Sequence, residues 1–158
     1  MFAGRYFHSI DSKNRLMIPA RYRDVLAEEK VRGLYATVDV FEGDRYLALY
    51  PTKGWEELLK RNEELARRDP DIALYVRKLL WDAEQLVPDK QGRLMMPERL
   101  MESAGLGNRV VLVGQGGHLE VWDEMRWKAF DAKAAGQLPK LQAKIYGQPD
   151  LAVRVQKP

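Results

Sequence analysis

The sequence predicts an α+β fold built from two tandem copies of a strand–turn–strand–helix unit. Residues 10–19 and 88–97 share an Asp, an Arg and a Pro in the same order, each pair lying 78 positions apart. These pairs are Asp11 and Asp89, Arg15 and Arg93, and Pro19 and Pro97. Three identities at one offset indicate an internal repeat. The short apolar run after each Arg is typical of a strand, and each Pro suits the first position of a helix, where its missing N–H is not needed.

The turn inside each unit is predicted from Lys13-Asn14 in the first copy and from Gln91-Gly92 in the second. Asn and Gly accept a positive φ more easily than other residues, so one backbone geometry can serve both copies. We therefore expect an Asp and an Arg, four positions apart, to flank a tight turn in each copy.

In the first copy, apolar spacing predicts a short amphipathic helix over 20–30 and a hairpin of strands 34–41 and 46–50. Two helices then follow, the first capped by Thr52 and the second beginning at Asp69-Pro70. We expect their apolar faces to pack on each other as a helical hairpin that separates the two copies.

In the second copy, the helix is predicted over 98–104 and ends at Gly105, and the hairpin strands are predicted over 109–113 and 118–122. This hairpin matches the first one at an offset of 72, so the first copy holds six extra residues between its helix and its hairpin. A last helix is expected directly after Asp123.

These elements predict four segments along the chain. They are a first module over 1–51, a connecting helical hairpin over 52–82, a second module with a C-terminal helix over 83–135, and a basic, partly ordered tail over 136–158. The tail is expected because glycines and prolines interrupt the helical pattern beyond Gly136.

Length and composition limit the function classes. A chain of 158 residues can bury a core, in one domain or in two small intertwined ones. The absence of cysteine excludes disulfides, thiolate chemistry and Cys-based zinc sites. No apolar run approaches the roughly 18 residues that cross a bilayer, and the N-terminus is too polar for a signal peptide, so we expect a cytoplasmic protein. A net charge of +3 and a pI of about 9.1 permit nucleic-acid binding without demonstrating it.

No group of residues has the pattern of a catalytic site. His8 and His118 are the only histidines, and no ligand spacing for a metal accompanies them. The cluster from Gly114 to Gly117 lacks the Lys-Ser/Thr of a phosphate-binding loop and lies between two predicted strands, which favours a hairpin turn. The sequence therefore predicts no enzyme, no metal and no cofactor.

The whole chain resembles the MraZ family of bacterial transcription regulators, which is built from tandem SpoVT/AbrB-type modules. The matching segments lie in order over most of residues 1–130. They are Met1-Phe2-x-Gly4, the stretch from Asp11 to Arg23, Leu47-x-Leu49-Tyr50-Pro51, Asp89-x-x-Gly92-Arg93-Leu94, Ala104-Gly105-Leu106, Val111-Leu112-Val113-Gly114 and Leu119-Glu120-Val121-Trp122. Asn14 stands where the family more usually has Gly, a mild change because Asn also accepts a positive φ.

The resemblance implies a pseudo-twofold, swapped-hairpin β-barrel formed by both halves, with peripheral helices, and a homo-oligomer whose subunits join in a ring. It implies binding of double-stranded DNA at short direct repeats in the promoter of the cell-division and cell-wall operon, upstream of the regulator's own gene. Such a protein would be nucleoid-associated. The implied DNA-binding residues are Arg15, Arg93, Lys13, Arg21, Arg23 and Lys90. The implied structural signature is Asp11, Asp89, Asn14, Gly92, Pro19 and Pro97.

The signature arginines have two readings that can hold together. A guanidinium can pair with guanine in the major groove or with phosphate, and a two-stranded ribbon fits that groove. Alternatively, each Asp–Arg pair is an ion pair that fixes its turn, within one copy or between copies. The lysines and the other arginines, Arg99 among them, are phosphate contacts if the turns face DNA, and an ordinary solvated surface otherwise.

A second function class stays open at this stage. Modules of this type also occur in antitoxins, which neutralise a toxin through an extended tail, so an antitoxin-like or other protein-interaction role is the alternative. The short tail without an acidic run and the double module favour the regulator.

Overall fold

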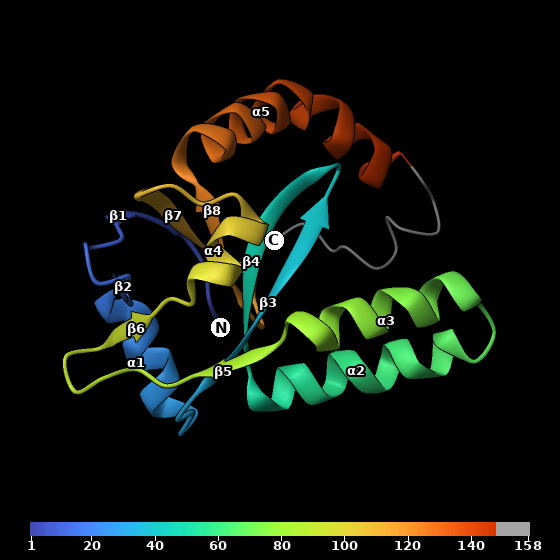
Figure 1. Cartoon of the computed structure of the whole chain (residues 1–158). Helices are drawn as coiled ribbons and strands as arrows, with labels where there is room; N and C mark the ends of the chain where they lie inside the picture. The colour runs from blue at the N-terminus through green and yellow to red at the C-terminus, as the bar shows by residue number, and fades with distance from the viewer. Residues whose placement is uncertain (148–158) are drawn as a thin grey trace. The chain divides into compact units, whose positions relative to one another are not determined.

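The computed structural model describes residues 1–147, and the chain divides into two compact units, Met1–Glu124 and Met125–Pro158 (Figure 1). The described part of the second unit belongs to helix α5 (Glu124–Tyr146) and ends at Gly147. This helix continues through Gly136 and Pro139, where the sequence pattern predicted a loss of regular structure. A proline removes one backbone hydrogen bond, and the good helix formers on both sides carry the helix past it. The rest of the predicted tail lies outside the described residues.

Six antiparallel strands of the first unit form one sheet in the order β1-β7-β8-β4-β3-β5. Their bounds are β1 (Arg5–Ser9), β7 (Arg109–Gly114), β8 (Leu119–Asp123), β4 (Asp44–Pro51), β3 (Leu34–Phe41) and β5 (Glu84–Leu86). Two further strands, β2 (Arg15–Met17) and β6 (Arg93–Met95), pair with each other as a separate antiparallel ribbon, the β2–β6 ribbon.

The expected closed barrel is wrong for residues 1–147. The sheet is open, with β1 and β5 as its end strands, and the β2–β6 ribbon is not part of it. Closing a barrel would require each end strand to find a second partner. The tight turns after β1 and β5 instead lead the chain into β2 and β6, and these three-residue strands satisfy their hydrogen bonds with each other.

The two copies exchange strands. Equivalent elements are β1 and β5, β2 and β6, α1 (Ala20–Glu28) and α4 (Glu98–Ala104), β3 and β7, and β4 and β8. The strand before the turn in each copy pairs with the hairpin of the other copy, β1 with β7 and β5 with β3. The two hairpins join through β4 and β8, where Ala48 lies opposite Glu120. Both copies therefore contribute to one sheet and one core.

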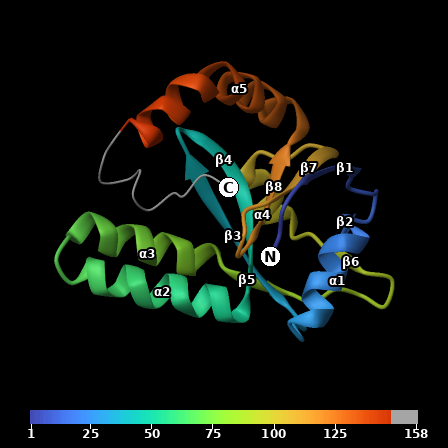
Figure 2. The ribbon, with the colours of Figure 1, turned by 180° about the vertical axis from the view of Figure 1, so that it is seen from behind.

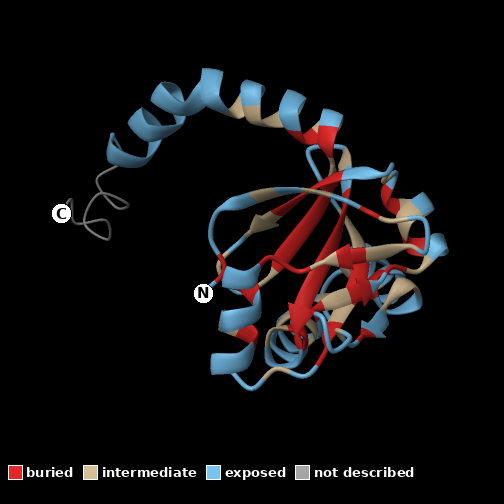
Figure 3. Cartoon of the chain, turned by 90° about the vertical axis from the view of Figure 1, so that its left-hand side faces the viewer, coloured by how far each residue is buried: buried red, intermediate tan, exposed pale blue. Residues whose placement is uncertain are grey.

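One face of the sheet packs on the β2–β6 ribbon and on helices α1 and α4. The core cluster of this layer includes Leu16 and Leu94 from the ribbon, Tyr22 from α1, and Leu47 and Leu112 from the sheet. All five are fully buried, and the buried residues follow the central strands in Figure 3. Helix α4 ends at Gly105 with φ 67°, which confirms the predicted glycine cap.

Helices α2 (Thr52–Ala66) and α3 (Pro70–Asp82) form the predicted helical hairpin and lie side by side (Figure 2). They contact β3 and β4 on the opposite face of these strands, where Thr37 Oγ1 donates a hydrogen bond to the carbonyl of Leu79 at 2.9 Å. Helix α3 begins with Pro70 in its first turn, as predicted, and Asp69 caps it by accepting the backbone N–H of Asp71. The cap predicted at Thr52 is wrong, because β4 turns directly into α2 at Pro51 and Thr52 is already helical. No helix within residues 1–147 has the length and apolar character needed to cross a membrane.

Candidate nucleic-acid interface

The first turn (Asp11–Asn14) is held by one carboxylate. Asp11 Oδ1 accepts the backbone N–H groups of Lys13 and Arg15, each at 2.9 Å. Asp11 Oδ2 accepts Nε–H of Arg15 at 2.7 Å. The backbone N–H of Asn14 donates to the carbonyl of Asp11 at 3.0 Å, and Asn14 takes the expected positive φ of 59°. The same side chain therefore shapes the turn and orients the guanidinium.

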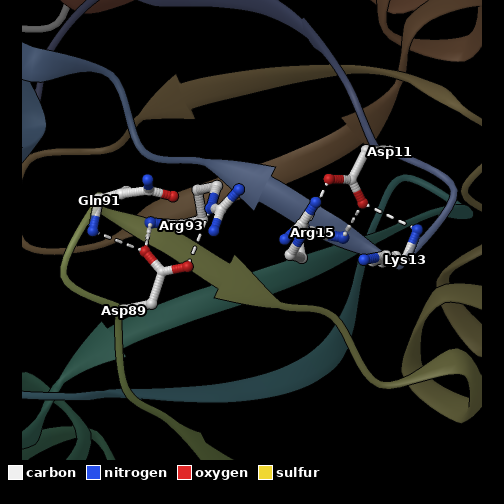
Figure 4. Close-up of polar contacts among 6 residues, drawn as sticks. All are labelled: Asp11, Lys13, Arg15, Asp89, Gln91 and Arg93. Carbon is white, nitrogen blue, oxygen red and sulfur yellow. Dashed lines mark hydrogen bonds and ion pairs between the residues drawn. The ribbon is translucent and has the colours of Figure 1, made fainter.

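The second turn (Asp89–Gly92) repeats this geometry. Asp89 Oδ1 accepts the backbone N–H groups of Gln91 at 2.9 Å and Arg93 at 3.0 Å, and its Oδ2 accepts Nε–H of Arg93 at 2.9 Å. Gly92 has φ 81° at the position of Asn14. Figure 4 shows both turns, with the two arginines between the two aspartates. The ion-pair reading therefore holds within each copy.

Both carboxylates are charged at neutral pH. The backbone N–H of Arg15 is the largest cause that lowers the pKa of Asp11 below its ordinary value of 3.8, and the guanidinium of Arg15 adds to it. Arg93 lowers the pKa of Asp89 in the same two ways. Each arginine is thus paired with an anion through Nε alone.

The β2–β6 ribbon directs both arginines outward. Arg15 lies opposite Met95 and Met17 lies opposite Arg93, while Leu16 lies opposite Leu94 at the centre. Successive strand residues point to opposite faces, and the two leucines are fully buried in the core. The arginines and methionines therefore share the outer face, where Arg15 and Arg93 are diagonal neighbours.

Hydrogen bonds between the copies hold the two turns beside the ribbon. The backbone N–H of Ile18 donates to the carbonyl of Gly92 at 2.9 Å, and that of Met96 donates to the carbonyl of Asn14 at 2.7 Å. Each turn is therefore fixed to the strand that leaves the other turn. Because Ile18 and Met96 are themselves buried, the ribbon has a rigid base.

This face can bind an anion or the edge of a base. Arg15 and Arg93 are 27% and 26% exposed, and within residues 1–147 their Nη groups have no hydrogen-bond partner. A guanidinium whose Nε is held by a carboxylate still presents its Nη donors in a fixed direction, as bidentate recognition of guanine or phosphate requires.

Comparison with known proteins gives one consistent family. The family model described as "MraZ protein, putative antitoxin-like" matches residues 1–77 and again residues 79–144. The chain belongs to the MraZ family. Proteins named "Transcriptional regulator MraZ" include one from Thermomicrobium roseum, 33% identical, with 92% of this chain and 97% of the relative covered. The relative from Roseiflexus castenholzii is 38% identical over 85% and 92% of the two chains, and that from Thiobacillus denitrificans is 40% identical over 85% and 88%.

The basic residues implied by the MraZ resemblance fall into two groups. Lys13 and Lys90 lie exposed on the two turns, and Arg21 and Arg23 lie exposed on α1. None of these four makes an ion pair with another described residue. Arg99 differs, because its guanidinium lies 3.4 Å from both Asp82 and Glu84.

Two features of the interface were missed from the sequence. Met17 and Met95 lie on the outer face beside the arginines, and Met95 is 59% exposed. The strict alternation of the Arg-Leu-Met run could have revealed this. Arg23 lies over the second turn, since a Cβ added to Gly92 would collide with Arg23 Cδ. No local pattern signals that contact, because 69 residues separate the two positions.

One other sequence expectation concerns a turn away from the ribbon. The Gly114–Gly117 stretch is the hairpin turn between β7 and β8, as predicted. It also receives the N-terminus, where Phe2 and Gly116 exchange two backbone hydrogen bonds of 2.8 Å. Within residues 1–147, no cluster of three His, Cys, Asp or Glu side chains could hold a metal.

Proposed function

We propose that the chain is a DNA-binding transcriptional regulator whose β2–β6 ribbon enters the major groove. The observation that carries this proposal is the pair of partly exposed arginines on the outer face of the ribbon, each oriented by its own aspartate. A two-stranded ribbon has the dimensions of the major groove, and guanidinium groups read the O6 and N7 acceptors of guanine. The names of the relatives support the same class of function.

The finer proposal follows from the family resemblance. The DNA is a set of short direct repeats in the promoter of the cell-division and cell-wall operon, upstream of the protein's own gene. The chain works as a homo-oligomer, in the form of a ring, so that linked ribbons gain affinity on spaced repeats. The modules over 1–51 and 83–135 act together as a swapped-hairpin unit, which the exchange of β1 and β5 between the copies supports.

Within this proposal the residues have distinct roles. Arg15 and Arg93 contact bases or the phosphates beside them. Lys13, Lys90, Arg21 and Arg23 contact phosphates, which requires charge and exposure more than fixed geometry. The aspartates repel DNA directly and act by orienting the arginines. Asn14 and Gly92 supply the positive φ of each turn. Pro19 and Pro97 precede α1 and α4 as their N-caps.

The test is binding of the purified protein to a fragment from upstream of its own gene, with a scrambled fragment as control, over a salt series. Arg15→Ala and Arg93→Ala are compared with Arg99→Ala, a matched loss of charge at an arginine already held by Asp82 and Glu84. We expect both ribbon variants to lose specific binding with the oligomer intact, and the Arg99 variant to retain it. Equal affinity for the two fragments at every salt concentration would refute the proposal.

An antitoxin-like interaction is the second candidate, because the description of the matching family model includes that word. It requires a protein partner. Purification from the native cell distinguishes the two roles: a small basic protein retained in a fixed ratio supports the antitoxin role, and a homogeneous homo-oligomer supports the regulator.

A further inference from the structure

The outer face of the β2–β6 ribbon presents the same residues after a half-turn about its centre. Strand β2 and strand β6 have the identical sequence Arg-Leu-Met, and their antiparallel register is centred on Leu16 and Leu94. A half-turn about this centre exchanges Arg15 with Arg93. The ribbon alone therefore presents the same groups in both orientations along a DNA duplex and cannot select one of them.

The residues beside the second turn are mainly basic. Ile18 binds the carbonyl of Gly92, which places the start of α1 at this turn, and Arg23 of α1 lies over Gly92. The first turn of α1 contains no acidic residue. We call this group the second-turn flank. Its charged members are Asp24, Arg21, Arg23, Asp89, Lys90 and Arg93.

The residues beside the first turn differ, although the backbone is equivalent. Met96 binds the carbonyl of Asn14, which places the start of α4 at this turn, but α4 begins with Glu98. Met101 occupies the position that Arg23 has in α1, and Arg99 is turned toward Asp82 and Glu84. The charged members of this first-turn flank are Asp11, Lys13, Arg15, Glu98, Arg99 and Glu102.

The two flanks therefore differ in charge at equal backbone geometry. The second-turn flank has four basic and two acidic side chains, whereas the first-turn flank has three basic and three acidic ones. In the first-turn flank, Arg99 is also paired with Asp82 and Glu84. Phosphates lie on both sides of a major groove, so a duplex centred on the ribbon would meet a basic edge on one side and a nearly neutral edge on the other.

We propose that the second-turn flank, with Arg23 at its centre, is a one-sided phosphate clamp that fixes the direction in which each chain lies on its DNA repeat. This inference rests on the proposed function and adds to it a division of roles. The symmetric arginines contact bases, and the asymmetric flank gives the complex its polarity. Phosphate contacts position a protein on DNA without reading sequence, so they can orient a ribbon whose base-reading groups are symmetric. A directional clamp suits direct repeats, in which every site points the same way.

Directed cleavage of DNA tests the polarity. The chain has no cysteine, so Ser12→Cys in the first turn and Gln91→Cys in the second each provide a single attachment site for an iron–EDTA reagent, and both positions are exposed. On the fragment from upstream of the gene, we expect each variant to cut on one side of every protected repeat, and the two variants to cut on opposite sides. Cuts on both sides from each variant, with specific binding retained, would overturn this inference alone. Loss of any preference over scrambled DNA in the unsubstituted protein would overturn the proposed function and this inference with it.

A matched pair of substitutions tests the role of Arg23. Arg23→Met introduces the residue found at the equivalent position 101, and Arg99→Met removes the same charge from the opposite flank. One phosphate contact contributes about 0.9 to the slope of log affinity against log salt concentration. Raising the salt from about 50 to 200 mM should therefore reduce the DNA affinity of Arg23→Met by about three-fold less than that of the unsubstituted protein. We expect Arg99→Met to keep the full slope. An unchanged slope and one-sided cleavage in folded Arg23→Met would overturn the clamp.

Discussion

Replacement of Gly92 by alanine tests the geometry of the second turn directly. Gly92 has φ 81°, in the left-handed region, and an added Cβ would collide with Arg23 Cδ. A left-handed conformation costs a residue with a Cβ about 1–2 kcal/mol. Arg23 is exposed, so its side chain can move away from the new methyl group. We therefore expect Gly92→Ala to lose about 1–2 kcal/mol of unfolding free energy, mostly from the backbone.

The hairpin between β3 and β4 supplies a matched control. Gly43 has φ 86°, and a Cβ added there meets no atom within 4 Å. Gly43→Ala should show the backbone cost alone. For a chain of this size, either substitution should lower Tm by roughly 2–8 °C when protein concentration is held constant. Gly92→Asn introduces the residue that the first turn has, so its backbone cost should be smaller while its Cβ still displaces Arg23.

The assay combines urea unfolding with DNA binding. We expect Gly92→Ala and Gly43→Ala to lose similar stability, and only the substitutions at Gly92 to weaken DNA binding and reduce its salt dependence. A stability loss at Gly92 above about 3 kcal/mol, beyond the backbone cost, would show that Arg23 cannot move and would refute the energetic reasoning. Unchanged DNA binding in both Gly92 variants would refute the importance of the Arg23 contact.

Three further predictions concern the turn aspartates, the buried Thr37 hydroxyl and the exchange of strands between the two copies. Because the pKa values of Asp11 and Asp89 are lowered in the folded chain, their stabilising effect is present above the ordinary value of 3.8 and is lost as pH falls through the lower folded values. We therefore expect the difference in unfolding free energy between the unsubstituted protein and the Asp11→Asn, Asp89→Asn double variant, measured with urea, to shrink below about pH 4. Thr37→Val should cost about 1–2 kcal/mol in urea unfolding, because the buried Thr37 hydroxyl donates to the Leu79 carbonyl, and Thr37→Ser should retain most of that stability. A fragment of residues 83–135 should sediment as a dimer, in which β6 of one molecule pairs around Leu94 with β6 of a second molecule. A folded monomer would contradict the strand exchange.

The local parts of the fold could be predicted from the sequence because short-range chemistry determines them. The spacing of Asp and Arg, with Asn14 or Gly92 between them, was enough to predict both turns, and the structure places the carboxylate contacts there. The strand over 34–41 and the helix over 98–104 have the predicted bounds. In each case the signal lies within one element.

The long-range parts could not be predicted in this way. Strand β5 has only three residues, too few for an alternating pattern, and its pairing with β3 depends on the packed core. The open sheet was missed because spacing does not reveal which strands become edges. The position of Arg23 over Gly92 depends on the pairing of two strands from different copies, and so does the diagonal placement of Arg15 and Arg93 on the outer face.

The two copies are most alike in the β2–β6 ribbon, the proposed DNA-binding surface. Arg, Leu and Met recur without change in β2 and β6, where Leu16 and Leu94 pack into one core and the arginines and methionines share the outer face. Away from this axis the copies diverge. The first is followed by the α2–α3 hairpin, and Arg23 has a methionine as its counterpart. In the proposed function, a symmetric ribbon with asymmetric flanks would give one chain the two properties that reading a direct repeat requires, a base-contacting face and a defined direction on the duplex.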